Sequence, residues 1–184
     1  ERVAPELTGE MPLAQPATWQ TTVQIGHTDE YLYFAFVCLQ PRESLRTQLS
    51  NAVNLAGNMA WGEDFVEVLL DPENRRSFHP RDVFHVLVKS NGSVICTKGL
   101  PGQALGGSAP WPARVRAAVK ILPDRWQVEL AVPLDDLEAR DKLGQWWGLD
   151  LVRATAAEAE ISSWSGAGTQ IYKPISLGNM FLAR

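Results

Sequence analysis

The sequence predicts an all-β protein: an antiparallel β-sandwich of jelly-roll or immunoglobulin-like layers with little helix. About nine or ten short runs of β-branched and aromatic residues follow one another along the chain. The connections between them are short and rich in Gly, Pro, Asn and Asp, which favour turns. Short strands at this spacing, without intervening helical patterns, are typical of two packed antiparallel sheets.

The first twenty residues differ from the rest of the chain. Pro5, Pro12 and Pro16 break regular structure, so residues 1–20 are predicted to be an irregular lead-in. Residues 21–184 are predicted to form a single β-sandwich domain, since the chain of 184 residues is long enough for one sizeable core.

Alternation and turn residues place the strands within that domain. The clearest hairpin turns at Asn91-Gly92, the strongest short turn signal. A short helix or long loop is expected within 41–59, a loop over 99–112, and a helical turn over 133–137. The predicted strands are 21–27, 31–38, 64–70, 83–89, 93–98, 114–121, 126–132, 147–153, 161–164 and one near 177–182.

Composition excludes several classes of partner. The net charge of −4 argues against nucleic acid, because phosphate binding needs a basic surface. No apolar run approaches the ~20 residues of a membrane-spanning helix. The chain begins at Glu1 without Met, which leads us to expect a processed protein or one domain of a longer protein.

The two cysteines, Cys38 and Cys96, both fall in predicted strands. Two buried free thiols are the favoured interpretation, and a single disulfide is the alternative. There is no Cys-x-x-Cys pair and no tight Cys/His cluster, so a structural zinc site is not expected.

The usual motifs of catalysis are missing, so we expect no enzyme. The sequence contains no Gly-x-Ser-x-Gly, no His-Glu-x-x-His and no P-loop, and its three histidines are scattered. One catalytic alternative stays open at this stage: a glycosidase pair made by Glu67 with Asp64 or Asp150.

Seven tryptophans give the strongest functional signal. Trp126 and Trp147 head strands in phase with apolar neighbours, so we place them in the core, whereas Trp146 would point the opposite way from Trp147. Trp61 and Trp164 lie at strand ends among polar residues. A flat indole beside hydroxyl and carboxylate groups suits a sugar ring, which stacks its CH face on the aromatic surface.

Glu67 lies in the middle of a predicted strand, on the face opposite its apolar neighbours. A carboxylate in that position must be solvated, paired or used for binding. A cross-strand pair with Arg153 or Lys89 is one interpretation. His85 would share the same face if the two strands are neighbours.

These features together resemble family 9 of the carbohydrate-binding modules and its wider relatives, over about Pro5 to Leu182. Seven pieces in the same order carry the resemblance. They are Pro5-Glu6-Leu7-Thr8-Gly9, Glu30 to Phe36, Trp61-x-x-Asp64-x-x-Glu67-x-x-x-Asp71, Phe84 to Gly92, Trp126-x-Val128-Glu129-Leu130-Ala131-Val132-Pro133-Leu134-x-x-Leu137, Trp147 to Arg153, and Ser162-Ser163-Trp164.

The resemblance implies a non-catalytic, lectin-like module that is usually attached to a larger secreted protein, and therefore an extracellular or periplasmic location. In sugar-binding members two tryptophans sandwich a glucose-type unit, and Trp61 and Trp164 fall at those positions. Glu67 falls at the position of a family carboxylate that forms hydrogen bonds with sugar hydroxyls. His85 and Ser163 are further ligand-binding candidates. The expected partner is a glucan- or xylan-type oligo- or polysaccharide. Some members also hold structural calcium.

Two departures motivate an alternative function. The best-known members have a basic residue that contacts sugar, and Leu87 lies near the corresponding position in this chain. They also have a polar amide just before the second tryptophan, and Ile161 lies near that position. The alternative is a structural or interaction β-sandwich domain of a larger extracellular protein, without sugar binding. Sandwiches of related shape bind haem, for which Met59, His85 and Met180 are the conceivable axial ligands.

Overall fold

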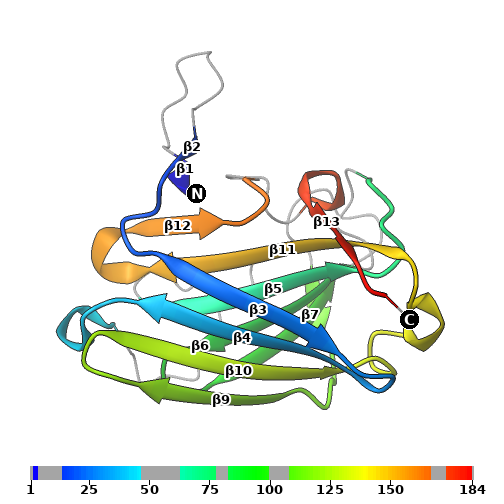
Figure 1. Cartoon of the computed structure of the whole chain (residues 1–184), viewed down its shortest axis with the longest axis horizontal. Coiled ribbons are helices and arrows are strands. Elements are labelled where there is room, and N and C mark those ends of the chain that lie inside the picture. Colours follow the sequence, from blue (N-terminus) through cyan, green and yellow to red (C-terminus); the bar gives the residue numbers. More distant parts are fainter. Residues whose placement is uncertain are drawn as a thin grey trace.

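The computed structural model describes residues 2–3, 14–46, 63–77, 83–99, 108–166 and 173–183. Their strands form two antiparallel sheets, one of four strands and one of nine, stacked face to face (Figure 1). The predicted all-β sandwich is confirmed. No helix among the described residues is long and apolar enough to cross a membrane.

The four-stranded sheet has the spatial order β3-β4-β10-β9. Its two central strands pair over their whole length, from Arg125 opposite Leu39 to Pro133 opposite Tyr31. This long register arises because both segments alternate, with every second residue buried. The strands are β3 (Thr21–His27), β4 (Tyr31–Leu39), β9 (Arg116–Ile121) and β10 (Arg125–Pro133).

The nine-stranded sheet has the order β2-β1-β12-β11-β5-β6-β7-β8, and β13 also pairs with β11. Its strands are β1 (Arg2–Val3), β2 (Ala14–Gln15), β5 (Phe65–Asp71), β6 (Phe84–Lys89), β7 (Val94–Gly99), β8 (Ser108–Pro110), β11 (Trp146–Thr155), β12 (Glu160–Ser163) and β13 (Gly178–Phe181).

One edge of β11 is shared by two strands, and this arrangement shapes the candidate site. β13 pairs with residues 146–149 of β11, and β12 pairs with residues 152–155. The two partner strands therefore part at Asp150 and Leu151. In Figure 1, β12 (orange) and β13 (red) lie at opposite ends of the long strand β11.

Several short elements differ from the sequence-based expectation. β1 and β2 fall inside the segment 1–20 that was expected to be irregular, because β1 pairs with β12 and with β2. β8 falls inside the predicted loop 99–112, where it pairs with β7. The predicted helical turn at 133–137 is a series of hydrogen-bonded turns after β10. The short 3-10 helices are η1 (Arg42–Ser44), η2 (Arg140–Lys142), η3 (Ala156–Glu158) and η5 (Pro174–Ser176).

The core lies between the sheets and contains the two tryptophans that were assigned to it. Trp126 and Trp147 are fully buried, and they pack with Phe34, Phe36 and other apolar residues of both sheets. Val66, Val68 and Leu70 belong to this core, so the predicted faces of β5 are confirmed. At about 25 cal/mol per Å² of apolar surface removed from water, this cluster is the main source of stability.

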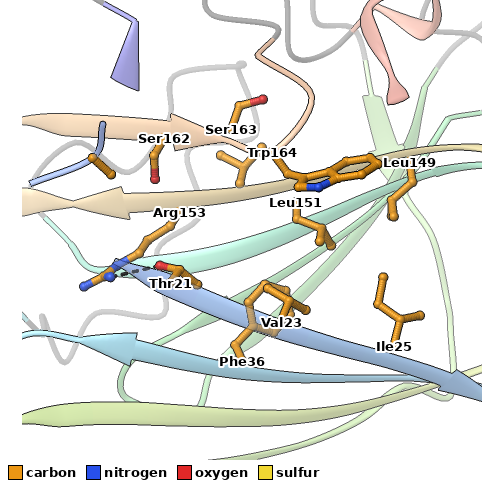
Figure 2. Close-up of a pocket in the computed structure, with 12 residues that line it drawn as sticks. Thr21, Val23, Ile25, Phe36, Leu149, Leu151, Arg153, Ser162, Ser163 and Trp164 are labelled. Atoms are coloured by element: carbon orange, nitrogen blue, oxygen red, sulfur yellow. Dashed lines mark hydrogen bonds between the residues drawn. The ribbon is translucent and has the colours of Figure 1, made fainter. Parts of the chain in front are cut away.

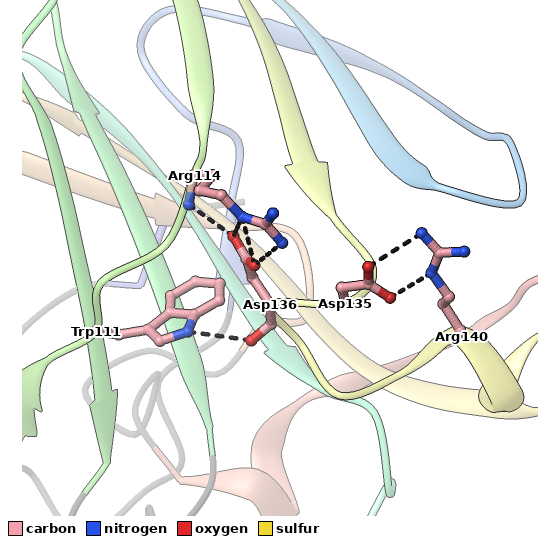
Figure 3. Close-up of polar contacts among 5 residues, drawn as sticks. All are labelled: Trp111, Arg114, Asp135, Asp136 and Arg140. Atoms are coloured by element: carbon pink, nitrogen blue, oxygen red, sulfur yellow. Dashed lines mark hydrogen bonds and ion pairs between the residues drawn. The ribbon is translucent and has the colours of Figure 1, made fainter.

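Trp111 and Arg114 hold the connection between β8 and β9 against Asp136 in the turn after β10, and Asp135 of the same turn pairs with Arg140 (Figure 3). The Trp111 ring packs edge-on against Phe84 at 4.8 Å between centroids, and its indole N–H donates to the Asp136 carbonyl at 3.1 Å. Arg114 binds the Asp136 carboxylate at 2.6 Å and lowers its pKa. Trp111 therefore anchors its loop against the sandwich.

The two cysteines are free thiols, as favoured by the sequence. Cys38 is buried on β4 and Cys96 is partly buried on β7. Burial raises the pKa of each to about 11, so both thiols remain protonated and unreactive at neutral pH.

Candidate functional site

Trp164 lies just beyond β12, at the point where β12 and β13 part along β11. Its backbone N–H donates to the Leu151 carbonyl at 2.9 Å. Its ring lies against Gly178, and a Cβ at that glycine would overlap the indole. Because the ring rests on a residue without a side chain, it is held in place while 53% of the residue stays exposed.

A pocket of about 290 Å³ opens beside Trp164, between β3 of one sheet and β11 of the other (Figure 2). Its walls are mainly apolar, with Trp164 and Ser162 at the β12 side. Thr21 and Ser163 also border it, and the apolar lining residues are Ala17, Val23, Ile25, Phe36, Leu149, Leu151 and Val152. An aromatic wall over an apolar floor with a few polar groups is a common form of small-ligand site.

Arg153 lines the same pocket and ties the two sheets together. Its guanidinium donates to the carbonyls of Trp19, Gln20 and Leu39 at 2.9–3.3 Å, and also to Thr21 and Gln40. Burial lowers the pKa of Arg153. With these five acceptors engaged, its main role is structural.

Ser163 and Asp150 fix the backbone where Trp164 begins. The Ser163 hydroxyl donates to the Asp150 carboxylate at 2.7 Å, and the backbone N–H groups of Ser165 and Leu151 donate to the same carboxylate at 3.0 and 2.8 Å. Burial raises the pKa of Asp150, and these donors act against that rise. Ser163 is itself buried, so its hydroxyl serves this network.

Glu67 and His85 lie together on the outer face of the nine-stranded sheet. Their side chains are 3.1 Å apart, and the residues are only 4% and 7% exposed. The expected pairing of Glu67 with Arg153 or Lys89 is wrong. Arg153 points toward the four-stranded sheet, and Lys89 forms a buried ion pair with Glu63.

The sequence-predicted site residues therefore fall into two groups. Ser163 lies opposite Val152 and shares the outer side of the sheet with Glu67 and His85. Trp164, one residue later, lines the pocket on the other side with Leu149 and Leu151. Trp61 lies outside the described residues, so the clamp of two tryptophans stays a prediction.

The two departures from the family pattern also lie on the outer face. Leu87 is directly opposite Glu67 in the pairing of β5 and β6. Ile161 packs against the small apolar cluster of Leu69, Val83, Val152 and Leu177. Neither supplies a hydrogen-bonding group beside Glu67.

Sequence reasoning missed Gly178 and the inter-sheet role of Arg153. Gly178 matters because β13 pairs with β11 next to Trp164, a long-range contact that no local pattern encodes. A buried arginine in an alternating strand was a usable signal, since it falls in phase with Leu149 and Leu151 rather than with the outer residues.

The described residues bring no cluster of metal-binding side chains together, and they do not fit a haem. No group of three or more His, Cys, Asp or Glu among them could hold a metal. Asp71 accepts backbone N–H groups from Glu73 and Arg75 instead. Met180 packs against the core and His85 lies on the outer face, so the sheet separates these two candidate haem ligands. Met59 lies outside the described part of the chain.

The carboxylates considered for glycosidase chemistry are occupied by protein donors. Asp64 is completely buried and accepts the N–H of Arg46, the N–H of Ala156 and the side-chain amide of Gln40. Asp150 is equally buried. Neither presents a carboxylate to solvent beside Glu67.

Comparison with known proteins places the fold. No family model and no curated protein sequence matches the chain. Two solved structures of a family 9 carbohydrate-binding module from Caldicellulosiruptor kristjanssonii, one with cellotriose and one with glucose, match with a TM-score of 0.65 each. They are 18% and 17% identical, and the matches cover 92% and 93% of this chain and 78% and 81% of theirs.

A third solved structure, a Bacteroides uniformis protein provisionally described as carbohydrate-binding, matches with a TM-score of 0.57. It is 12% identical, and the match covers 81% of this chain and 70% of that one. The chain therefore has the β-sandwich fold of the family 9 carbohydrate-binding modules.

Proposed function

We propose that this protein is a non-catalytic carbohydrate-binding module that stacks a sugar on Trp164. The observation that carries the proposal is a half-exposed indole, held over Gly178 beside a pocket, in a fold shared with modules solved with cellotriose and glucose. An aromatic ring that borders a pocket offers a ligand a surface for stacking.

The proposed ligand is a glucan- or xylan-type sugar unit. The CH face of the pyranose would stack on the Trp164 indole, a contact worth about 1–2 kcal/mol. Trp61 would supply the second ring of the clamp. A shallow site of this kind binds in the micromolar to millimolar range.

Glu67, His85 and Ser163 are the proposed partners for sugar hydroxyls. Because Glu67 and His85 bond each other and are nearly buried, a sugar would have to reach them from the outer face of the nine-stranded sheet. Conservative Glu67→Gln and Ser163→Ala variants test this part of the proposal separately from Trp164.

We also propose that the module works within a larger secreted protein, outside the cytoplasm. Support comes from the resemblance to modules of that kind. The test is to blot cell and medium fractions of the source organism for the full-length protein. Protein outside the cytoplasm would support the proposal.

The test of the sugar site is calorimetric titration with cellotriose, xylotriose and glucose. We expect Trp164→Ala to weaken binding about tenfold or more, which is ~1.4 kcal/mol. Trp146→Ala is the matched control, because Trp146 is also an exposed tryptophan, at 59%, and lies at the far end of β11. Equal affinities for the wild type and Trp164→Ala would refute the stacking role.

A second variant moves Trp164 without removing it. In Gly178→Ala the added methyl group would overlap the indole, so the ring must leave its place. We expect weaker sugar binding with an unchanged far-ultraviolet circular dichroism spectrum. Unchanged affinity in this variant would show that the resting position of Trp164 is not the binding position.

The second candidate function is an interaction domain without sugar binding. The observation that favours it is the exposed ring pair Trp146 and Phe181, with centroids 5.2 Å apart and residues 59% and 50% exposed. Exposed aromatic groups of this kind often mark protein contacts. Calorimetry without heat from any sugar, together with loss of a partner on Trp146→Ala, would favour this candidate.

A further inference from the structure

A second hollow, of about 570 Å³, lies over the face of the four-stranded sheet, and Ile25 is the one lining residue that it shares with the Trp164 pocket. Residues from all four strands line it. The polar and aromatic side chains are Gln24 on β3, Tyr33 on β4, Glu129 on β10 and Arg116 on β9. None of these four lines the pocket beside Trp164.

The groove exists because small residues alternate with large ones on this face. Two adjacent rows cross the strands: Gln24, Ala35, Glu129 and Ala118 form one, and Gly26, Tyr33, Ala131 and Arg116 form the other. Adjacent strands are ~4.8 Å apart, so four strands give a groove roughly 15 Å long. Gln24 and Arg116 stand on the two edge strands, Tyr33 and Glu129 stand on the two central strands, and Gly or Ala lies between the large residues of each row.

The groups along the groove suit an uncharged ligand rich in hydroxyls. Arg116 and Glu129 are exposed diagonal neighbours, and neither forms an ion pair with any described residue. Their formal charges cancel, and Gln24 adds a neutral amide. On one face, a guanidinium can donate hydrogen bonds to hydroxyl oxygens, a carboxylate can accept them from hydroxyl groups, and an amide can do both.

Tyr33 supplies the aromatic surface that such a ligand needs. Its residue is 41% exposed, and its ring is tilted by 34° against Tyr31, with centroids 6.0 Å apart. The neighbour restricts the ring, and part of its surface stays exposed. The phenol also offers a hydroxyl to the ligand.

We propose that this face is a second glycan-binding surface, which takes an uncharged chain of several sugar units across the strands. It is independent of Trp164, so it stands or falls separately from the first sugar site. The balanced charges argue against an anionic or cationic partner. The Gly and Ala residues of this face do not provide the large apolar anchors of a stable protein interface, which makes a second copy of this chain the weaker occupant.

The experiment is titration of 15N-labelled protein with cellohexaose and with xylohexaose, followed by backbone amide signals. It is run on wild type and on Trp164→Ala. We expect saturable shifts at Gln24, Ala35, Glu129 and Ala118 with at least one hexasaccharide in both proteins. The corresponding monosaccharide, glucose or xylose, should bind at least fivefold more weakly. Absence of these shifts with both hexasaccharides overturns the proposal.

Two groove variants and one control complete the test. Tyr33→Ala removes the ring and Ala118→Trp fills the groove, and each should abolish the shifts in the Trp164→Ala background. Phe181→Ala removes an exposed aromatic residue elsewhere and should leave them unchanged. Shifts that persist in both groove variants overturn the proposal, as does dimerisation in sedimentation analysis that Ala118→Trp abolishes. Loss of the Trp164 site alone would leave the groove shifts in place.

Discussion

The outer faces of the two sheets carry ionisable groups in contrasting states. On the nine-stranded sheet the pairs Glu63–Lys89 and Glu67–His85 are buried against each other. On the four-stranded sheet Glu129 and Arg116 stand exposed and unpaired among the described residues. A buried charge needs a partner within the protein, whereas an exposed charge is available to a ligand. The comparison therefore separates residues that hold the fold from residues that can bind.

The largest expected effect comes from breaking the buried pair of Lys89 and Glu63. Lys89→Met leaves the Glu63 carboxylate buried without its partner, which should cost about 3–5 kcal/mol in the free energy of unfolding. Urea denaturation measures this cost. On the exposed face, the matched Glu129→Ala change should stay within about 0.5 kcal/mol.

A double variant separates the pair from its burial. Glu63→Gln combined with Lys89→Met removes both charges, so much of the lost stability should return. Equal losses for Lys89→Met and Glu129→Ala would remove the distinction between the two faces.

The sequence anticipated the faces of the strands but not these partners. Alternation put Val66 and Val68 in the core and Glu67 outside, and both assignments are confirmed. The partner of Lys89, however, is Glu63, which precedes β5 and has no place in the strand pattern. When one member of an ion pair lies outside the strands, the pairing depends on the tertiary structure, and local periodicity does not predict it.

The same limit applies to the candidate site. The polar surroundings of Trp164 marked it in the sequence, and it is exposed. That its ring rests on Gly178 depends on β13 and β12 sharing one edge of β11. One-residue alternation also explains why Ser163 and Trp164, adjacent in sequence, lie on opposite sides of the sheet.

A smaller effect is expected from the Glu67–His85 pair. Glu67→Ala leaves a nearly buried imidazole without this carboxylate, at a cost of about 1–3 kcal/mol in unfolding free energy. Thermal and urea denaturation measure it, and Glu67→Gln, which keeps an acceptor, should cost less. A loss as small as that of Gln24→Ala on the open face would mean that the pair does not contribute to stability.

The smallest effect is a pH dependence at Asp150. Burial raises the pKa of this carboxyl, so the folded protein binds its proton more tightly than the unfolded chain does. The protonated form therefore stabilises the fold below the ordinary carboxyl pKa, and this contribution is lost as pH rises through the raised value. Asp150→Asn, which mimics the neutral form, should gain stability relative to wild type between pH 3.5 and pH 7.

Urea denaturation at several pH values measures the Asp150 effect. Asp71 also has a pKa raised by burial, and it is present in both proteins, so it cancels from the difference. A difference between wild type and Asp150→Asn that stays constant or reverses over this range would contradict the assignment.

The most direct test of sugar binding at Trp164 follows the indole N–H signals of the seven tryptophans by 15N NMR during titration with cellotriose. The account predicts a saturable shift of the Trp164 signal, which is absent in Trp164→Ala, while the signals of the fully buried Trp126 and Trp147 stay in place. No movement of the Trp164 signal at millimolar cellotriose, xylotriose and glucose would contradict it.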